Sequence, residues 1–223
     1  MEKKIITTTD GSHSIFLPEM DEHYHSTHGA IAESEHIFIE CGLLKAAEAT
    51  TKLKVFEVGL GTGLNVLSSL KASMANHLQV EMHSIEAFPL SWNEVDQLNF
   101  SSLLGIDPDI LKKIHQSDWN QAVQLSDEFT LHKHLGEVQK FDFNDTIFDV
   151  IYFDAFAPEK QENMWTEEIF SGLYQCLKSN GILVTYCVKG EVRRRLQKIG
   201  FEVEKLPGPI GGKREILRAV KSL

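Results

Sequence analysis

The strongest pattern along the chain is a nearly unbroken run of apolar and β-branched residues at positions 148–154. Such a run predicts a strand that is buried on both faces of a parallel sheet. Shorter runs alternate with segments of helical periodicity, the order typical of α/β proteins. From residue 55 onward we expect strands at residues 55–58, 79–86, 129–135, 148–154, 181–187, 201–206 and 213–220. The expected helices cover residues 64–71, 91–99, 109–116, 165–178 and 191–199.

The N-terminal region follows a different pattern. Residues 5–17 flank Asp10-Gly11, a pair favoured in two-residue hairpin turns, and predict a small hairpin. Two helices are expected after it, at residues 30–41 and 43–49. We expect the segment between the hairpin and these helices to fold over a ligand of the main domain.

The last two expected strands are joined by a loop rich in proline and glycine, and they predict an antiparallel hairpin at the sheet edge. The seven strands together predict a mostly parallel α/β sheet. We divide the chain into an N-terminal hairpin and helical lid region, residues 1–50, and one main domain, residues 51–223.

The first expected strand runs into a glycine-rich turn with G-x-G-x-G spacing, formed by Gly59, Gly61 and Gly63. A dinucleotide-binding fingerprint places its third glycine one residue later. Glycine lets the backbone approach a ligand and adopt positive φ, and Glu57 is available to a cationic group nearby. The turn therefore favours a nucleoside linked to an amino acid. With Asn65 it resembles motif I of the S-adenosylmethionine-dependent methyltransferases.

Carboxylates end the next three parallel strands of the pattern. Ligands of open α/β sheets lie at the carboxyl ends of the strands. Glu86 stands 23 residues after Gly63, where a carboxylate can accept hydrogen bonds from ribose hydroxyls. Glu137 follows the third strand and is a candidate adenine contact. Asp154 ends the fourth strand, which faces the transferred group, and is the candidate reactive carboxylate.

Length and composition limit the function further. A chain of 223 residues can bury the core of one large domain. No apolar run reaches the roughly 18 residues that a membrane-spanning helix needs, and the N-terminus is too polar for a signal peptide. A reducing cytoplasm is expected, because no C-x-x-C motif joins the three cysteines. These are Cys41, Cys176 and Cys187.

Charge is distributed unevenly along the chain. The net charge of −10 argues against a general nucleic-acid binder. Residues 178–223 nevertheless hold 11 Lys and Arg against 4 Asp and Glu, whereas residues 1–177 hold 11 against 28. The basic quarter is either a phosphate-binding patch or a solvated face, and composition does not decide between them.

Four histidines lie close together before the glycine-rich turn: His23, His25, His28 and His36. No pair has the spacing of a known metal site with a carboxylate as third ligand. We therefore expect no metal in the site.

Motifs spread over almost the whole chain resemble the methyltransferase half of MnmC-type enzymes, the tRNA 5-methylaminomethyl-2-thiouridine methyltransferases. The D-x-F-A-P block of residues 154–158 and the N-M-W block of residues 163–165 are its most specific parts. Two residues depart from the family pattern, Glu137 in place of an aspartate and Ala155 in place of a glycine. The other matching stretches are Tyr24-His25-Ser26, Gly29-Ala30, Glu33-Ser34, residues 57–65, Val192-Arg193-Arg194 and Gly212-Lys213-Arg214-Glu215.

The resemblance implies a Rossmann-like class I methyltransferase that uses S-adenosylmethionine. The substrate would be the aminomethyl group of a wobble uridine in a tRNA anticodon stem-loop. Asp154 would hold the ammonium form of this group and aim its lone pair, with general-base action as a secondary role. The cofactor would contact Glu57, Gly59, Gly61, Gly63, Asn65, Glu86, Glu137 and Asp154.

Aromatic and basic residues complete the implied site. Phe156 and Trp165 would stack on the flipped uracil, although a core position suits Trp165 equally well. The tRNA phosphates would meet Arg193, Arg194, Lys213 and Arg214. Two-domain members of the family also carry a flavin-dependent oxidase, for which this chain is too short. The resemblance thus implies a stand-alone cytoplasmic methyltransferase. A separate flavin-dependent oxidase is then a candidate supplier of its aminomethyl uridine substrate.

Three other functions stay open. A methyltransferase of the same fold acting on a small-molecule amine is favoured by the acidic body and disfavoured by the basic C-terminal quarter. A non-catalytic S-adenosylmethionine-binding module is disfavoured by an intact Asp154 with its neighbouring carboxylates. A nicotinamide dehydrogenase is disfavoured by the G-x-G-x-G spacing.

Overall fold

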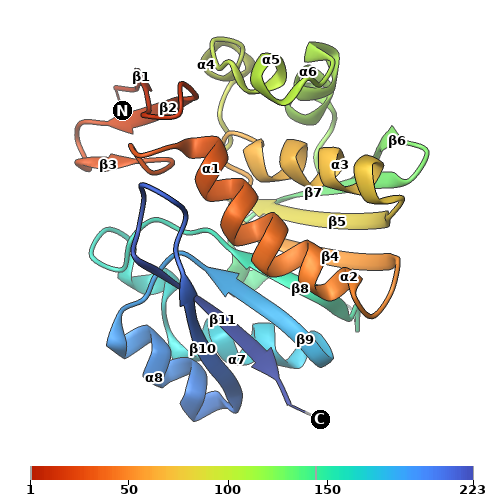
Figure 1. Ribbon diagram of the computed structural model, residues 1–223, viewed down its shortest axis with the longest axis vertical. Helices are drawn as coiled ribbons and strands as arrows, with labels where there is room; N and C mark the ends of the chain where they lie inside the picture. Colours follow the sequence, from red (N-terminus) through yellow and green to blue (C-terminus); the bar gives the residue numbers. More distant parts are fainter. Residues whose placement is uncertain (1, 144, 223) are drawn as a thin grey trace.

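The computed structural model describes residues 2–143 and 145–222, and within them eight strands form one central sheet (Figure 1). Five strands are parallel, in the order β7–β5–β4–β8–β9. At one edge β6 pairs antiparallel with β7, and at the other β11 and β10 are antiparallel. The bounds are β4 (Lys52–Val58), β5 (Gln79–Glu86), β6 (Ala122–Ser126), β7 (Phe129–Leu135), β8 (Phe148–Phe153), β9 (Leu177–Thr185), β10 (Phe201–Pro207) and β11 (Glu215–Lys221).

Helices cover both faces of the sheet and form a hydrophobic cluster on each. On β8, Val150 and Tyr152 belong to one cluster, and Ile151 and Phe153 to the other. This alternation is what the two-residue period of a strand requires, and it explains the unbroken apolar run. The helices are α1 (Ala30–Ser34), η1 (Glu35–Leu44), α2 (Lys45–Ala47), α3 (Leu64–Asn76), α4 (Trp92–Val95), α5 (Phe100–Leu104), α6 (Pro108–Gln116), η2 (Val138–Lys140), η3 (Glu162–Met164), α7 (Glu167–Gln175) and α8 (Gly190–Ile199).

The expected α/β class and the parallel core are confirmed, but the expected count of seven strands is wrong. The additional strand is β6, in which Val123 and Leu125 are buried between exposed residues. A run of five residues is too short to stand out from its surroundings by periodicity. The bounds also shift at β9, which was expected at residues 181–187 but begins at Leu177 and ends at Thr185, and pairs irregularly with β8.

Residues 30–47 form one continuous helical segment and not the two expected helices, because α1, the π-helical η1 and α2 follow one another without a break. Gly42, between the two expected helices, lies within η1. A Cβ atom on Gly42 would lie 3.1 Å from Val184 Cγ2 and 3.3 Å from Tyr152 Cε1. Glycine therefore allows the helix to lie close to β8 and β9.

The N-terminal hairpin is confirmed and gains a third strand: β1 (Lys4–Thr7), β2 (His13–Leu17) and β3 (Glu22–His23). Five residues connect β1 to β2, not the expected two, because Thr7 pairs with His13. In this connection Asp10 accepts hydrogen bonds from the backbone amides of Ser12 (2.9 Å) and Ala32 (3.0 Å). The carboxylate thereby joins the hairpin to the start of the long helix, where anionic groups are stabilised.

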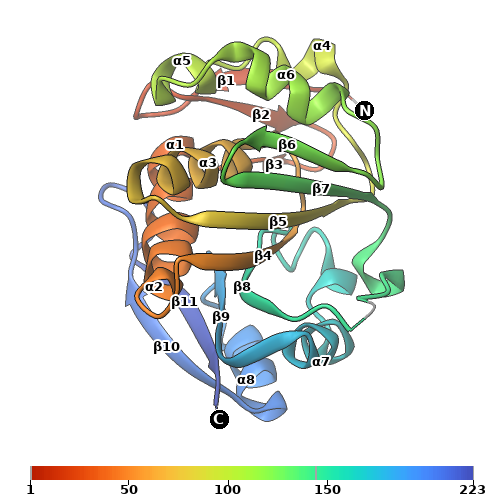
Figure 2. The same ribbon diagram turned by 90° about the vertical axis from the view of Figure 1, so that its right-hand side faces the viewer.

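The small sheet and helices α4–α6 form a layer above the edge formed by β6, β7 and β5 (Figure 2). Ile15 and Leu17 of β2 belong to the same hydrophobic cluster as Val55 of β4. A boundary near residue 50 therefore does not separate two cores. None of the helices in residues 2–143 and 145–222 combines the length and apolar character needed to cross a membrane.

Candidate functional site

A cavity of about 590 Å³ lies at the carboxyl ends of β4, β5, β7 and β8. Its volume is within the range of small-molecule and cofactor sites. The segment after β3, which we expected to fold over a ligand, lines the cavity together with the first turn of the long helix. The lining residues from this side are Glu22, His23, Tyr24, His25, Ser26, Thr27 and Glu33.

The glycine-rich turn leaves its backbone bare at the cavity. Gly59 has a φ of 96°, and a Cβ atom there would lie 2.9 Å from the carbonyl oxygen of Asp154. A Cβ atom on Gly61 would lie 3.3 Å from the Tyr24 ring. Gly63, at the start of α3, does not line the cavity and instead lies against His115. Two of the three predicted glycines thus line the cavity, and the third shapes the turn into the helix.

Glu86 and Glu137 both line the cavity from the ends of β5 and β7, as expected from their positions. Glu86 Oε2 accepts a hydrogen bond from the Gly61 amide (3.0 Å), and Oε1 accepts one from the Phe88 amide (2.8 Å). The carboxylate therefore holds the glycine-rich turn. Glu137 forms an exposed ion pair with Lys140 at 2.8 Å.

Glu57 is fully buried and does not line the cavity. Ser84 donates a hydrogen bond to its Oε2, whereas Oε1 has no hydrogen-bond partner within the described residues. Burial raises the pKa of Glu57 to about 8, and the charges of Asp154 and Glu86 add to this, while the Ser84 bond opposes it. The structure thus places Glu57 behind the turn, where the expected contact with a cationic ligand group is not direct.

Asp154 lines the cavity at the end of β8 and is held by a chain of hydrogen bonds. Asn65 Nδ2 donates to Asp154 Oδ2 (2.9 Å), and Ser34 Oγ donates to Asn65 Oδ1 (2.6 Å). Burial raises the pKa of Asp154 to about 7, helped by the charge of Glu33 and opposed by the Asn65 bond and Lys213. The site therefore holds a carboxylate that a bound cation would strongly stabilise.

Glu33 is a cavity residue that the sequence matched to the family without suggesting a role. Its Oε2 accepts a hydrogen bond from the Ser26 amide (2.8 Å), while its buried Oε1 makes no hydrogen bond within the described residues. Lys213 Nζ lies 3.4 Å from Oε1 and 3.6 Å above the ring of Tyr186. No local motif relates Glu33 to Asp154, because they meet only through the fold.

The two candidate stacking aromatics differ in position. Phe156 lines the cavity, with its ring 5.1 Å from that of Tyr24 in an edge contact. Trp165 is fully buried, packs edge-on against Phe153, and donates from Nε1 to the carbonyl oxygen of Phe156 (2.8 Å). The expectation that Trp165 stacks on a base is therefore corrected: it is the core residue that supports the backbone at Phe156.

Of the four basic candidates, Lys213 lines the cavity and the other three do not. Arg194 and Arg214 are exposed, and Arg193 is partly buried. The neighbouring Arg195 makes a structural contact, since its Nη1 donates a hydrogen bond to the carbonyl oxygen of Trp165 (2.6 Å). The arginine run thus points in several directions, as helical spacing requires.

A parallel α/β sheet with a bare glycine turn and carboxylates around a cavity at its strand ends defines a Rossmann-like protein that binds a nucleoside cofactor. The sequence model of a family described as S-adenosyl-L-methionine-dependent methyltransferase matches residues 107–222, just over half of the chain. The chain belongs to this family, and its cofactor is S-adenosylmethionine.

Individual relatives are similar over most of this chain. The chain is 32% identical to the tRNA 5-methylaminomethyl-2-thiouridine biosynthesis bifunctional protein MnmC of Cupriavidus necator, over 89% of this chain and 31% of the relative. It is also 32% identical to the protein of the same name from Cupriavidus metallidurans, over 95% of this chain and 33% of the relative. The chain therefore spans about a third of the length of the curated relatives it matches.

Solved structures share the fold. The crystal structure of MNMC2 from Aquifex aeolicus superposes with a TM-score of 0.79 at 23% identity, covering 100% of this chain and 71% of that one. Spermidine synthase from Thermotoga maritima reaches a TM-score of 0.53 at 14% identity, covering 100% of this chain and 72% of that one. Both likenesses concern the fold.

The buried Glu57 gives a pH prediction for the protein without ligand. Its pKa is raised from 4.5 to about 8, so between these values the folded state holds a proton that the unfolded chain has released. The free energy of unfolding should therefore fall as pH rises through this window, by up to about 1.4 kcal/mol per pH unit. Glu57→Gln should lack this contribution and gain stability relative to wild type as pH rises.

Urea denaturation at a series of pH values measures the difference between the two proteins. Asp154 contributes a slope of the same sign to both, so subtraction isolates Glu57. The exposed Glu128 provides the control substitution, Glu128→Gln. Parallel stability curves for wild type and Glu57→Gln would contradict the prediction.

Proposed function

We propose that this protein transfers a methyl group from S-adenosylmethionine to the amine of 5-aminomethyl-(2-thio)uridine at the wobble position of tRNA. The observation that carries the proposal is the Asp154 carboxylate, held by Asn65 at the cavity and accompanied by Glu33. The names of the relatives support tRNA as the substrate. The reaction belongs in the cytoplasm, where tRNA is modified.

The residues around the cavity can be assigned to the cofactor by their place. Gly59 and Gly61 offer bare backbone, Glu86 offers acceptors for ribose hydroxyls, and Glu137 lies where the adenine would end. When bound, the cofactor supplies an electrophilic methyl group on a sulfonium. Glu57 acts from behind the turn, through its hydrogen bond with Ser84, and not by direct contact.

The amine is the difficult part of the reaction. An alkylamine has a pKa of roughly 10, so it arrives as an ammonium without a free lone pair. Asn65 occupies Oδ2 of Asp154, and Oδ1 would accept the ammonium in a charge-assisted hydrogen bond. The carboxylate then orients the nitrogen and, because its pKa is raised to about 7, is a better proton acceptor than an exposed aspartate. Positioning is its main role, and general-base action is secondary.

Glu33 provides a second negative charge for the ammonium. Its Oε1 is buried, lines the same cavity and has only the 3.4 Å ion pair with Lys213 within the described residues. Two carboxylates on one cavity repel each other, which raises the pKa of Asp154, and a cation between them removes this repulsion. The pair therefore selects a cationic substrate group.

The RNA contacts belong to the mouth of the cavity. Phe156 offers a ring for the flipped uracil, and Lys213 is a cation beside it. Arg193, Arg194 and Arg214 would meet phosphates of the anticodon stem-loop, in a complex that salt weakens. A separate flavin-dependent oxidase would supply the aminomethyl uridine.

A second candidate function is the methylation of a small-molecule amine. The acidic residues lining the cavity favour it, because they suit a small cation without any RNA: Glu22, Glu33, Glu86, Glu137 and Asp154.

Methyl transfer from radiolabelled S-adenosylmethionine to two tRNA pools separates the two functions. One pool carries aminomethyl uridine at the wobble position, and the other lacks it. We expect label only in the first pool. Absence of label from both pools, with calorimetry still detecting cofactor binding, would reject tRNA as the substrate.

Asp154→Asn tests the reactive carboxylate. The amide keeps the size of the side chain but neither carries charge nor accepts a proton from an ammonium. Methyl transfer should fall by about 10²-fold or more, while calorimetric affinity for S-adenosylmethionine stays near wild type. Turnover close to wild type would show that another group holds the amine.

Glu33→Gln tests the second carboxylate. Glu35→Gln, two residues further along the same helical segment, is the matched control. The Glu35 side chain is 42% exposed and pairs with Lys71. Loss of a charged hydrogen bond of about 1.5–3 kcal/mol should lower kcat/KM for tRNA about 10- to 100-fold. Removing the charge should also lower the pKa of Asp154, so the acid limb of the pH–rate profile should move to lower pH. Equal profiles for the two variants would exclude this role.

A further inference from the structure

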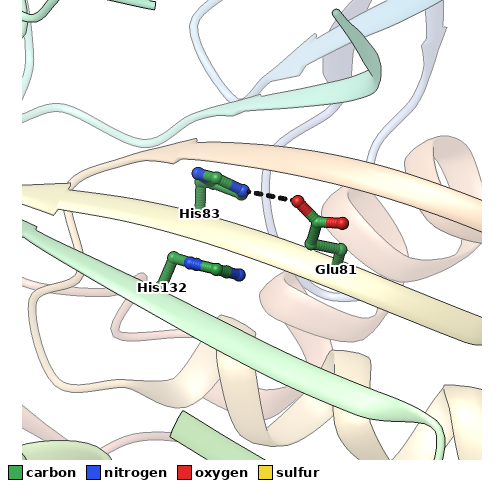
Figure 3. Close-up of side chains that lie close together, drawn as sticks. All are labelled: Glu81, His83 and His132. Carbon is green, nitrogen blue, oxygen red and sulfur yellow. Dashed lines mark hydrogen bonds and ion pairs between the residues drawn. The ribbon is translucent and has the colours of Figure 1, made fainter. Parts of the chain in front are cut away.

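A group of side chains of the types that ligate metals lies on the sheet and does not line the cavity. Glu81 and His83 belong to β5 and His132 to β7. One potential ligand atom from each side chain lies within 4.8 Å of the other two. Figure 3 shows an imidazole nitrogen of each ring on the side of the Glu81 carboxylate.

Strand register produces this arrangement. His83 pairs directly with His132 in the parallel β5–β7 ladder. Glu81 is two residues before His83, so the period of the strand brings its side chain to the same face. Met82, between them, belongs to the cluster on the opposite face, which α3 covers. The three ligands are therefore fixed by backbone pairing and not by a mobile loop.

The two histidines differ in their hydrogen bonding. His83 Nδ1 lies 3.1 Å from His134 Nε2, so its second nitrogen has a hydrogen-bond partner that restricts the orientation of the ring. His83 Nε2, 3.0 Å from Glu81 Oε1, lies toward the shared centre. The His132 ring stacks on that of His83, with centroids 4.3 Å apart and planes inclined by 11°, so one ring must turn before a nitrogen of each can bind the same ion. Within the described residues, the His132 ring makes no hydrogen bond.

The surroundings combine an apolar wall with one competing charge. The Phe148 ring lies 5.3 Å from that of His83, and the Phe141 ring lies 4.7 Å from that of His134. Lys54 Nζ lies 3.0 Å from Glu81 Oε1 and carries a positive charge that a metal ion would have to displace. The Lys54 side chain is 42% exposed, so it can turn toward solvent.

We propose that Glu81, His83 and His132 form a binding site for a divalent transition-metal ion, with Zn²⁺ as the fitting ion. Two imidazoles and one carboxylate suit Zn²⁺ and disfavour Mg²⁺ and Ca²⁺, which require oxygen ligands. Binding replaces the His83–Glu81 hydrogen bond and leaves the fourth tetrahedral position to water. The ion joins β5 to β7, whose ends carry Glu86 and Glu137 at the cavity. This site does not depend on the proposed methyl transfer.

Zn²⁺ titration of the chelator-stripped full chain, followed by calorimetry, tests the proposal. We expect a site of one Zn²⁺ per chain that His83→Gln and His132→Gln each weaken by about 10-fold or more. His28→Gln, at an exposed histidine outside the cluster, is the matched control and should leave that affinity unchanged. Lys54→Gln should tighten binding, because it removes the competing charge.

Co²⁺ bound to the unaltered chain gives a readout that does not depend on the variants folding. A tetrahedral site with two nitrogen ligands produces visible absorption bands, which excess Zn²⁺ should abolish. Zn²⁺ should also raise the Tm, since it binds the folded state. Absence of these bands, or equal Zn²⁺ affinity in wild type and in a folded His132→Gln, would overturn the proposal. Loss of binding in His28→Gln would also overturn it, by identifying a different surface site.

Discussion

The hydrogen-bond chain from Ser34 through Asn65 to Asp154 joins three segments that are far apart in the sequence. Ser34 donates a hydrogen bond to the Asn65 side-chain carbonyl oxygen. This bond orients the Asn65 amide so that its nitrogen donates to the Asp154 carboxylate. A buried carboxylate without such a donor is strongly unfavourable. This series of hydrogen bonds can form only when the long helix packs on the sheet. Gly42 permits this packing, since a side chain there would meet β8 and β9, and Gly59 permits the close approach of the turn to the backbone of Asp154.

The cavity contains more negative charge than its own residues neutralise. Glu33 and Asp154 face it, Glu57 lies behind it, and Lys213 is the cation beside Glu33. Burial and mutual repulsion raise the pKa of Asp154 and Glu57, so the folded protein alone is less stable than it would be with neutral side chains. A ligand that brings positive charge removes this penalty. Stability at neutral pH and affinity for a cationic group thus have one physical origin.

Sequence could predict those parts of the site that follow directly from a strand. Burial on both faces produces the apolar run before Asp154, and the carboxyl end of a parallel strand reaches the cavity, as Glu86 and Asp154 do. The sequence could not predict the direction of side chains that lie outside the strands. Trp165 follows the Asp154 segment, yet its ring lies in the core, and Glu33 shares the cavity with Asp154 only through helix packing. The sequence did not predict the short β6, because Val123 and Leu125 are the only large apolar residues among its five.

The histidines show why proximity in sequence is a poor guide to a site. The N-terminal histidines are near one another in the chain, but His25 bonds to Ser14 and Thr62 whereas His36 bonds to Glu40 and the Pro207 carbonyl. In contrast, 49 residues separate His83 and His132, and no spacing rule relates them. The β5–β7 register alone brings them together. The same two strands end at the cavity described above, so a shift of one residue in their pairing would disturb both places at once.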